Sequence, residues 1–137
     1  MGHAIRFRGG WTLSGGNLAA AADKVRPERF TLPCVWPSEI AGVVRLERRF
    51  QTPPLDTACE CPRLRLDAVA GLISADLNGE SLGVVGPSDH ALDLAVALPP
   101  RASNVLTLEV DVEAASAHAR GKPWGEVALV IEPIVAI

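Results

Sequence analysis

Aromatic side chains are scarce in this chain of 137 residues, and tyrosine is absent from it. Aromatic residues make up 4% of the sequence, whereas all hydrophobic types together make up 48%. A hydrophobic core must therefore be built mainly from Leu, Val, Ile and Ala, a mixture that suits the interior of a β-sandwich. The length fits one domain over residues 1–137, large enough to fold without disulfides or a structural metal.

Neither sign of charge predominates, because 13 basic residues are spread among 16 acidic ones and the net charge is -3. No strong field attracts a polyanion, so we expect no nucleic-acid partner. No apolar run approaches the roughly 20 residues that cross a bilayer, and the first residues do not resemble a signal peptide. We therefore expect no membrane partner. We expect the chain to be cytoplasmic, or extracellular if it is a fragment of a longer secreted protein.

The three cysteines, Cys34, Cys59 and Cys61, cannot form a complete disulfide framework because their number is odd. A metal site on Cys59 and Cys61 with Cys34 or a histidine stays open, but the Cys-x-x-Cys spacing of structural zinc sites is missing. A calcium site at Asp89 or Asp93 shows too few ligands in the sequence. We predict reduced, partly buried thiols and no metal or cofactor.

Alternating apolar and polar residues recur in RLRLDAV at 63–69, HALDLAVAL at 90–98 and NVLTLEVDV at 104–112. Such alternation predicts antiparallel strands with one wet and one buried face. The final segment, GEVALVIEPIVAI at 125–137, is apolar on both faces until Glu132, which indicates a central strand or one covered by something else. From the number of such runs we predict an all-β sandwich of two antiparallel sheets with about eight strands.

Strand signals also occur nearer the N-terminus, in RFTLP at 29–33 and VVRLERRF at 43–50. In the second run Arg48 falls on the apolar face, so it needs a partner or a route to solvent. Before these runs, NLAAAADKV at 17–25 predicts a single helical turn or an ordered loop. The segment EAASAHARGKP, which contains His118, is expected to be a polar loop.

Two asparagines mark connections between strands. Asn78-Gly79 lies between two strand-like runs and is a strong hairpin signal, because both turn positions adopt positive φ. Asn104 is expected to begin a strand by closing a turn with its side chain.

The sequence contains, in this order, Gly10-Trp11, Pro33, Trp36, Gly42, Arg48-Arg49-Phe50, LRLDAVAGLISADLNGESLG, LDLAVAL and Asn104-Val105-Leu106. This order resembles the sugar-binding jelly-roll domain of glycoside hydrolase family 2, one of the galactose-binding-like sandwiches. The resemblance covers nearly the whole chain and implies a jelly-roll β-sandwich. Because β-galactosidases and β-glucuronidases carry such a domain at their N-terminal end, the resemblance also implies an association with carbohydrate.

Catalytic motifs are missing from the chain. The barrel that bears the two catalytic carboxylates of the family is absent. Hydrolysis of a glycosidic bond needs two carboxyl groups roughly 5 to 10 Å apart, and no motif identifies such a pair. Ser88, Asp89 and His90 have the residue types of a triad, but adjacent residues on an extended chain point to alternate sides. We therefore predict that the chain is not an enzyme.

Two functions from different classes remain open. As a carbohydrate-binding module for an oligo- or polysaccharide, the chain would present Trp36, Trp124, Asp89 and His90 from loops at one end of the sandwich. The alternative for both tryptophans is packing in the core. As a structural or assembly domain, the chain would use its surface for self-association or for a partner domain. Exposed rings favour sugar binding, and buried rings favour assembly.

Overall fold

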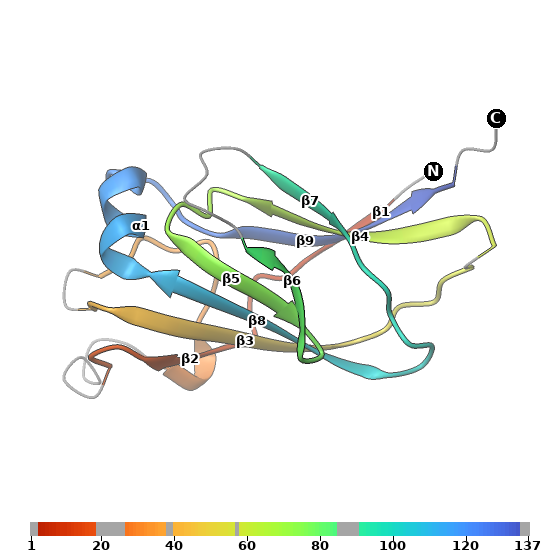
Figure 1. Ribbon diagram of the computed structural model, residues 1–137, viewed down its shortest axis with the longest axis horizontal. Coiled ribbons are helices and arrows are strands. Elements are labelled where there is room, and N and C mark those ends of the chain that lie inside the picture. The colour runs from red at the N-terminus through yellow and green to blue at the C-terminus, as the bar shows by residue number, and fades with distance from the viewer. Residues whose placement is uncertain (1–2, 19–26, 38–39, 57, 85–90, 135–137) are drawn as a thin grey trace.

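The computed structural model describes residues 3–18, 27–37, 40–56, 58–84 and 91–134. These residues form two antiparallel sheets packed face to face, with a short helix at one end (Figure 1). The four-stranded sheet has the order β1 (His3–Arg6), β9 (Glu126–Pro133), β4 (Glu60–Asp67) and β7 (Leu92–Ala95). The five-stranded sheet has the order β2 (Trp11–Gly15), β3 (Val43–Gln51), β8 (Ser103–Asp111), β5 (Leu72–Leu77) and β6 (Glu80–Val84).

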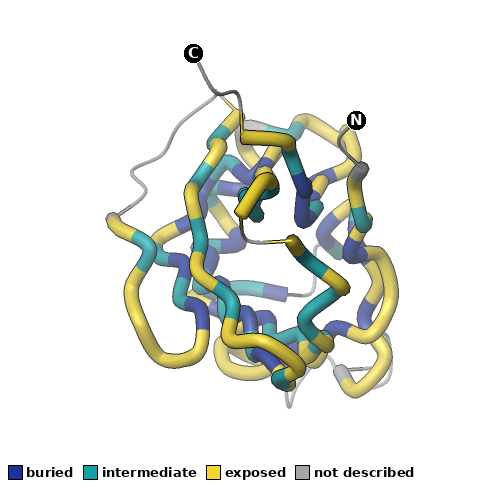
Figure 2. Tube along the Cα trace, turned by 90° about the vertical axis from the view of Figure 1, so that its right-hand side faces the viewer, coloured by how far each residue is buried: buried dark blue, intermediate teal, exposed yellow. Residues whose placement is uncertain are grey.

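The predicted all-β sandwich is confirmed, with nine strands in the described residues where about eight were expected. Its core comes from the alternation read in the sequence. Leu64 and Leu66 on β4 and Leu106 and Leu108 on β8 are all buried, while the residues between them are more exposed. Figure 2 shows the buried positions gathered between the two layers and the exposed ones along the outer loops. Within the described residues, no helix is long and apolar enough to span a membrane.

Strand β9 lies between β1 and β4, so the segment that is apolar on both faces is a central strand. Leu129 and Ile131 point into the core and are buried. On the opposite face Val130 is only 7% exposed, and its register neighbours are Ala4 on β1 and Arg63 on β4. Strand β9 is therefore flanked by strands on both sides. Of the two expectations for this apolar segment, a central strand or one covered by something else, the first is confirmed.

The hairpin between β5 and β6 turns at Asn78-Gly79, as predicted. Both residues have positive φ, 54° for Asn78 and 83° for Gly79. A two-residue loop with positive φ at both positions twists in the same sense as the strands that it joins, which is why the sequence signal is specific.

Helix α1 (Val112–Ala119) corrects the expectation of a polar loop around His118. The helix begins directly after β8, where the Asp111 carboxylate accepts hydrogen bonds from the backbone N–H groups of Glu113 and Ala114. This cap satisfies donors that the first helical turn leaves free. The strand alternation continues to Val112 without a break, so the sequence pattern hid the start of the helix.

Gly71 makes the close packing of this helix possible. A Cβ at position 71 would lie 2.7 Å from the Ala115 backbone nitrogen and 2.8 Å from the Asp111 carbonyl oxygen. The φ of Gly71 is 81°, a value that side chains rarely allow. Glycine is therefore required here by both space and backbone conformation.

The segment RFTLP is not a strand, contrary to expectation. Its one isolated bridge joins Phe30 to Trp11, and its first residue, Arg29, ends a single 3-10 turn at Pro27–Arg29. Its partner Trp11 lies on an edge strand and already pairs with Arg48 on its other side. The helical turn expected at 17–25 falls mostly on residues outside the described ranges.

Candidate functional site

The tryptophans form an aromatic cluster at one end of the sandwich. Trp36 is 6% exposed and Trp124 is 1% exposed, and their ring centroids lie 5.3 Å apart. Phe30 stacks on Trp36 at a centroid distance of 5.5 Å. The Trp124 indole N–H donates a 2.8 Å hydrogen bond to the Ala70 carbonyl oxygen. Both rings are thus packed in the core, which is the alternative that the sequence left open for them. Neither ring face is presented to solvent.

The four residues predicted to contact sugar are not brought together in the described part of the chain. Trp36 and Trp124 lie in the core, and Asp89 and His90 lie outside the described residues. The third tryptophan, Trp11, is also fully buried. A stacking platform of tryptophan is therefore not available at the surface.

Arg48 illustrates how a charged residue is accommodated on an apolar strand face. Its guanidinium lies 4.6 Å from the centroid of the Phe7 ring, in a cation–π contact. Its Nε donates to the Gly9 carbonyl oxygen at 2.7 Å, and Nη1 donates to the Arg49 carbonyl oxygen at 3.3 Å. Partial burial lowers the pKa of Arg48 from its ordinary value. The partner that the sequence required is thus an aromatic ring with backbone carbonyls.

The cysteines do not assemble a metal site in the described residues. Cys34, Cys59 and Cys61 are free thiols, and no group of three or more His, Cys, Asp or Glu residues there could hold a metal ion. Burial raises the pKa of the Cys34 thiol to about 12. A hydrogen bond with Asp56 raises the pKa of the exposed Cys59 thiol. Both thiols are consequently weak nucleophiles at neutral pH, because the thiolate is the reactive form.

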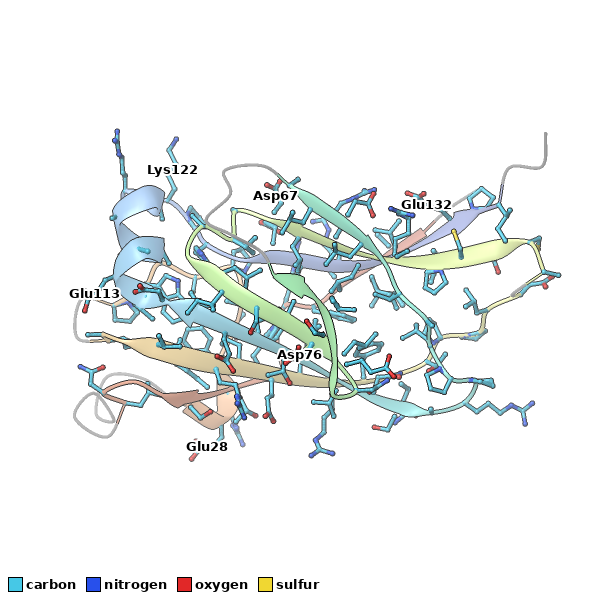
Figure 3. The ribbon with its side chains drawn as sticks, in the orientation of Figure 1. Glu28, Asp67, Asp76, Glu113, Lys122 and Glu132 are labelled. Atoms are coloured by element: carbon cyan, nitrogen blue, oxygen red, sulfur yellow. The ribbon has the colours of Figure 1, made fainter. Side chains whose placement is uncertain are left out.

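The outer face of the four-stranded sheet carries a row of ion pairs. Asp93 on β7 accepts from Arg63 at 2.7 Å and from Arg65 at 3.4 Å, and Arg65 also reaches Glu132 on β9 at 3.3 Å. The hydrogen bond from Arg63 lowers the pKa of Asp93. Asp93, considered as a calcium ligand in the sequence, is therefore engaged by two arginines. In Figure 3 the labelled carboxylates are spread over both sheets, the helix and the 3-10 turn.

A buried polar network centred on Asn104 lies at the end of the sandwich opposite α1. The Asn104 side-chain amide is fully buried and donates to the Thr52 hydroxyl at 2.8 Å and to the Phe50 carbonyl oxygen at 3.3 Å. Its oxygen accepts from the Asn78 side-chain amide at 2.9 Å, and the Asn78 oxygen accepts from the Val105 backbone N–H at 2.9 Å. Asn104 lies at the start of β8, as its second residue, close to the predicted position, but its side chain joins three segments rather than one turn.

The signal for this inward position was present in the sequence. Asn104 has the same parity as Leu106 and Leu108, so alternation alone places its side chain on the buried face. A buried amide must be hydrogen-bonded, which indicates partners from neighbouring segments.

The outer face of the five-stranded sheet is polar in its central part, although Val43 and Ile73 are exposed near its ends. Strand register aligns two rows across β2, β3, β8 and β5, one of Thr12, Glu47, Thr107 and Asp76 and one of Ser14, Arg45, Glu109 and Ser74. Arg45 and Glu109 form an exposed ion pair at 3.4 Å. Since adjacent strands lie about 4.8 Å apart, each row of four residues spans about 14 Å. Hydroxyl, carboxylate and guanidinium groups are thus presented side by side.

Two grooves meet near the Asn104 network. The larger, of about 650 Å³, is lined by Thr52, Pro53, Pro54, Leu55, Leu98, Pro100 and Arg101. The smaller, of about 520 Å³, lies between the β5–β6 hairpin and residues 95–99. Leu98 lines both grooves, so it forms the wall that they share.

Comparison with known proteins finds similar folds among solved glycosidase structures. Bifidobacterium dentium β-glucuronidase, in complex with coumarin-3-O-glucuronide, matches with a TM-score of 0.68 and 21% identity, over 96% of this chain and 30% of that chain. Bacteroides uniformis β-glucuronidase matches with a TM-score of 0.69 and 20% identity, over 97% of this chain and 18% of that chain. A putative β-galactosidase from Bacteroides fragilis matches with a TM-score of 0.67 and 19% identity, over 95% and 23%. No protein-family model and no curated protein matches the sequence.

The chain spans less than a third of each of these proteins. Sequence identities this low establish the fold alone. The resemblance read from the sequence is thereby confirmed at the level of architecture. The chain has the jelly-roll β-sandwich fold that these β-glucuronidase and β-galactosidase structures contain.

Proposed function

We propose that this chain is a non-catalytic accessory domain that associates with carbohydrate. The likeness to glycosidase structures supports an accessory role, because it runs over almost the whole chain but over a small part of each of those proteins.

The observation that carries the proposal is the polar outer face of the five-stranded sheet. With the tryptophans buried, sugar hydroxyls would be recognised by polar side chains rather than by stacking. Glu47, Thr107 and Asp76 lie in one row of neighbouring strands and offer both donors and acceptors. A rigid sheet holds these groups at fixed spacing, so the side chains need little ordering when a sugar binds.

Titration calorimetry with a panel of galactosides, glucuronides and polysaccharides tests this proposal. We expect saturable binding to at least one member, weakened about tenfold or more in Glu47→Gln or Thr107→Ala, because the first replaces a carboxylate acceptor by an amide and the second removes a hydroxyl. Glu126→Gln, an exposed change on the opposite sheet, serves as the matched control and should leave binding intact. Absence of binding across the panel would refute carbohydrate association.

A second candidate function is a structural or assembly domain. The burial of Trp36 and Trp124 favours it, because these rings stabilise the fold and leave no aromatic sugar platform. Light scattering coupled to gel filtration over a range of protein concentrations separates the two functions. A concentration-dependent dimer together with no sugar binding would support assembly, and a monomer that binds sugar would exclude it.

A further inference from the structure

The walls of the larger groove are rigid, and hydrogen bonds join them to each other. Three of its lining residues, Pro53, Pro54 and Pro100, have φ fixed by their rings. Thr52 ties the two walls, since its backbone N–H donates to the Ala102 carbonyl oxygen at 2.9 Å. Its hydroxyl donates to the carbonyl oxygen of Pro99 at 2.7 Å. A ligand would therefore meet a groove that is already formed, and binding would not have to order the loops.

The chemistry of the lining is apolar with one cation. Leu55 and Leu98 are partly buried and pack against the core. The Thr52 hydroxyl is already engaged, because it also accepts from Asn104 at 2.8 Å. Arg101 is exposed and takes part in none of the ion pairs formed among the described residues. The lining thus offers an apolar surface and one basic residue, Arg101, that has no acidic partner there.

We propose that this groove binds a small organic anion with an apolar ring. The ring lies against Leu55, Leu98 and the prolines, and the Arg101 guanidinium holds the carboxylate or sulfonate group. Guanidinium groups pair with such anions through two parallel hydrogen bonds. The volume of about 650 Å³ lies within the range of small-molecule sites. A neutral sugar fits less well, because the lining has few free groups for hydroxyls, so this site is separate from the proposed carbohydrate face.

The test uses 1-naphthoate as the probe and 1-naphthamide as its uncharged counterpart. Binding is followed by NMR through the methyl signals of Leu55 and Leu98 and the amide signals of Thr52 and Arg101, since prolines have no N–H. We expect saturable shifts with naphthoate at these residues. We also expect naphthamide to bind about twofold to fivefold more weakly, as for the loss of an exposed charge interaction.

Arg101→Gln should weaken naphthoate binding by the same factor without changing naphthamide binding. Arg120→Gln is a matched control, because Arg120 is also exposed and has a similar positive φ, 49° against 51° for Arg101, but it caps α1 far from the groove. The proposal is overturned if naphthoate produces no saturable shifts at the groove residues. It is equally overturned if naphthamide binds as well as naphthoate, or if Arg101→Gln and Arg120→Gln have the same effect.

Discussion

Replacing the fully buried Asn104 by alanine should destabilise the fold severely. The change removes the hydrogen bonds to the Thr52 hydroxyl and the Phe50 carbonyl oxygen, and it leaves the Asn78 amide without its acceptor. A lost hydrogen bond has a net value of about 1 kcal/mol, and a buried polar group left unsatisfied costs about 1–3 kcal/mol. The sum is about 3–5 kcal/mol, a large part of the roughly 5–15 kcal/mol that stabilises a typical domain.

Urea unfolding followed by tryptophan fluorescence measures this loss, because all three tryptophans are buried in the native state. With a slope of about 2 kcal/mol per molar, the midpoint should fall by about 2 M. Ser103→Ala, an exposed change next to Asn104, should stay within about 0.5 kcal/mol. Asn104→Asp should regain stability relative to Asn104→Ala as the pH falls, since burial favours the neutral acid. A loss below about 1 kcal/mol in Asn104→Ala would refute the argument.

Three further predictions concern glycine, thiol and ion-pair positions. Gly71→Ala should cost at least about 2 kcal/mol more in chemical unfolding than Gly79→Ala, because both have positive φ but only position 71 meets backbone atoms; equal losses would contradict this. Ellman's reagent at pH 8 should label Cys59 long before Cys34, because Cys59 is exposed. The free energy of unfolding should decline as the pH rises from 9 toward about 12, the pKa of Cys34 in the folded protein, and this decline should be missing in Cys34→Ala. Asp93→Asn should lower the free energy of unfolding by at most about 1 kcal/mol at neutral pH. The difference in stability between the two proteins should vanish as the pH falls through the lowered pKa of Asp93. A larger loss that does not depend on salt concentration would contradict this prediction.

The strands could be predicted from the sequence because each is a local pattern. Alternation identifies a strand and its buried face without reference to the rest of the chain, as for β4 and β8. The Asn78-Gly79 hairpin was equally local, since its backbone angles suit only a few residue types. Helix α1 was not, because it depends on the Asp111 cap and on the space left by Gly71, and neither follows from periodicity.

The candidate sites depend on contacts that sequence order does not reveal. Trp36 and Trp124 are far apart along the chain, and only the fold brings their rings together in the core. The groove between residues 52–55 and 98–101 likewise joins segments from different parts of the chain. Residue type suggested a role for the tryptophans, but the exposure that decides between stacking and packing is a property of the assembled sandwich.

Strand β9 is the last strand of the fold to be synthesised, yet it occupies the middle of its sheet, between β1 and β4. A nascent chain that ends before residue 126 therefore holds β1 and the β4–β7 pair of that sheet without the strand that joins them. The backbone groups of β4 that pair with β9 then remain open on a growing polypeptide. Closure of the four-stranded sheet must therefore wait for β9, so β1 joins this layer only after the rest of these strands have been made.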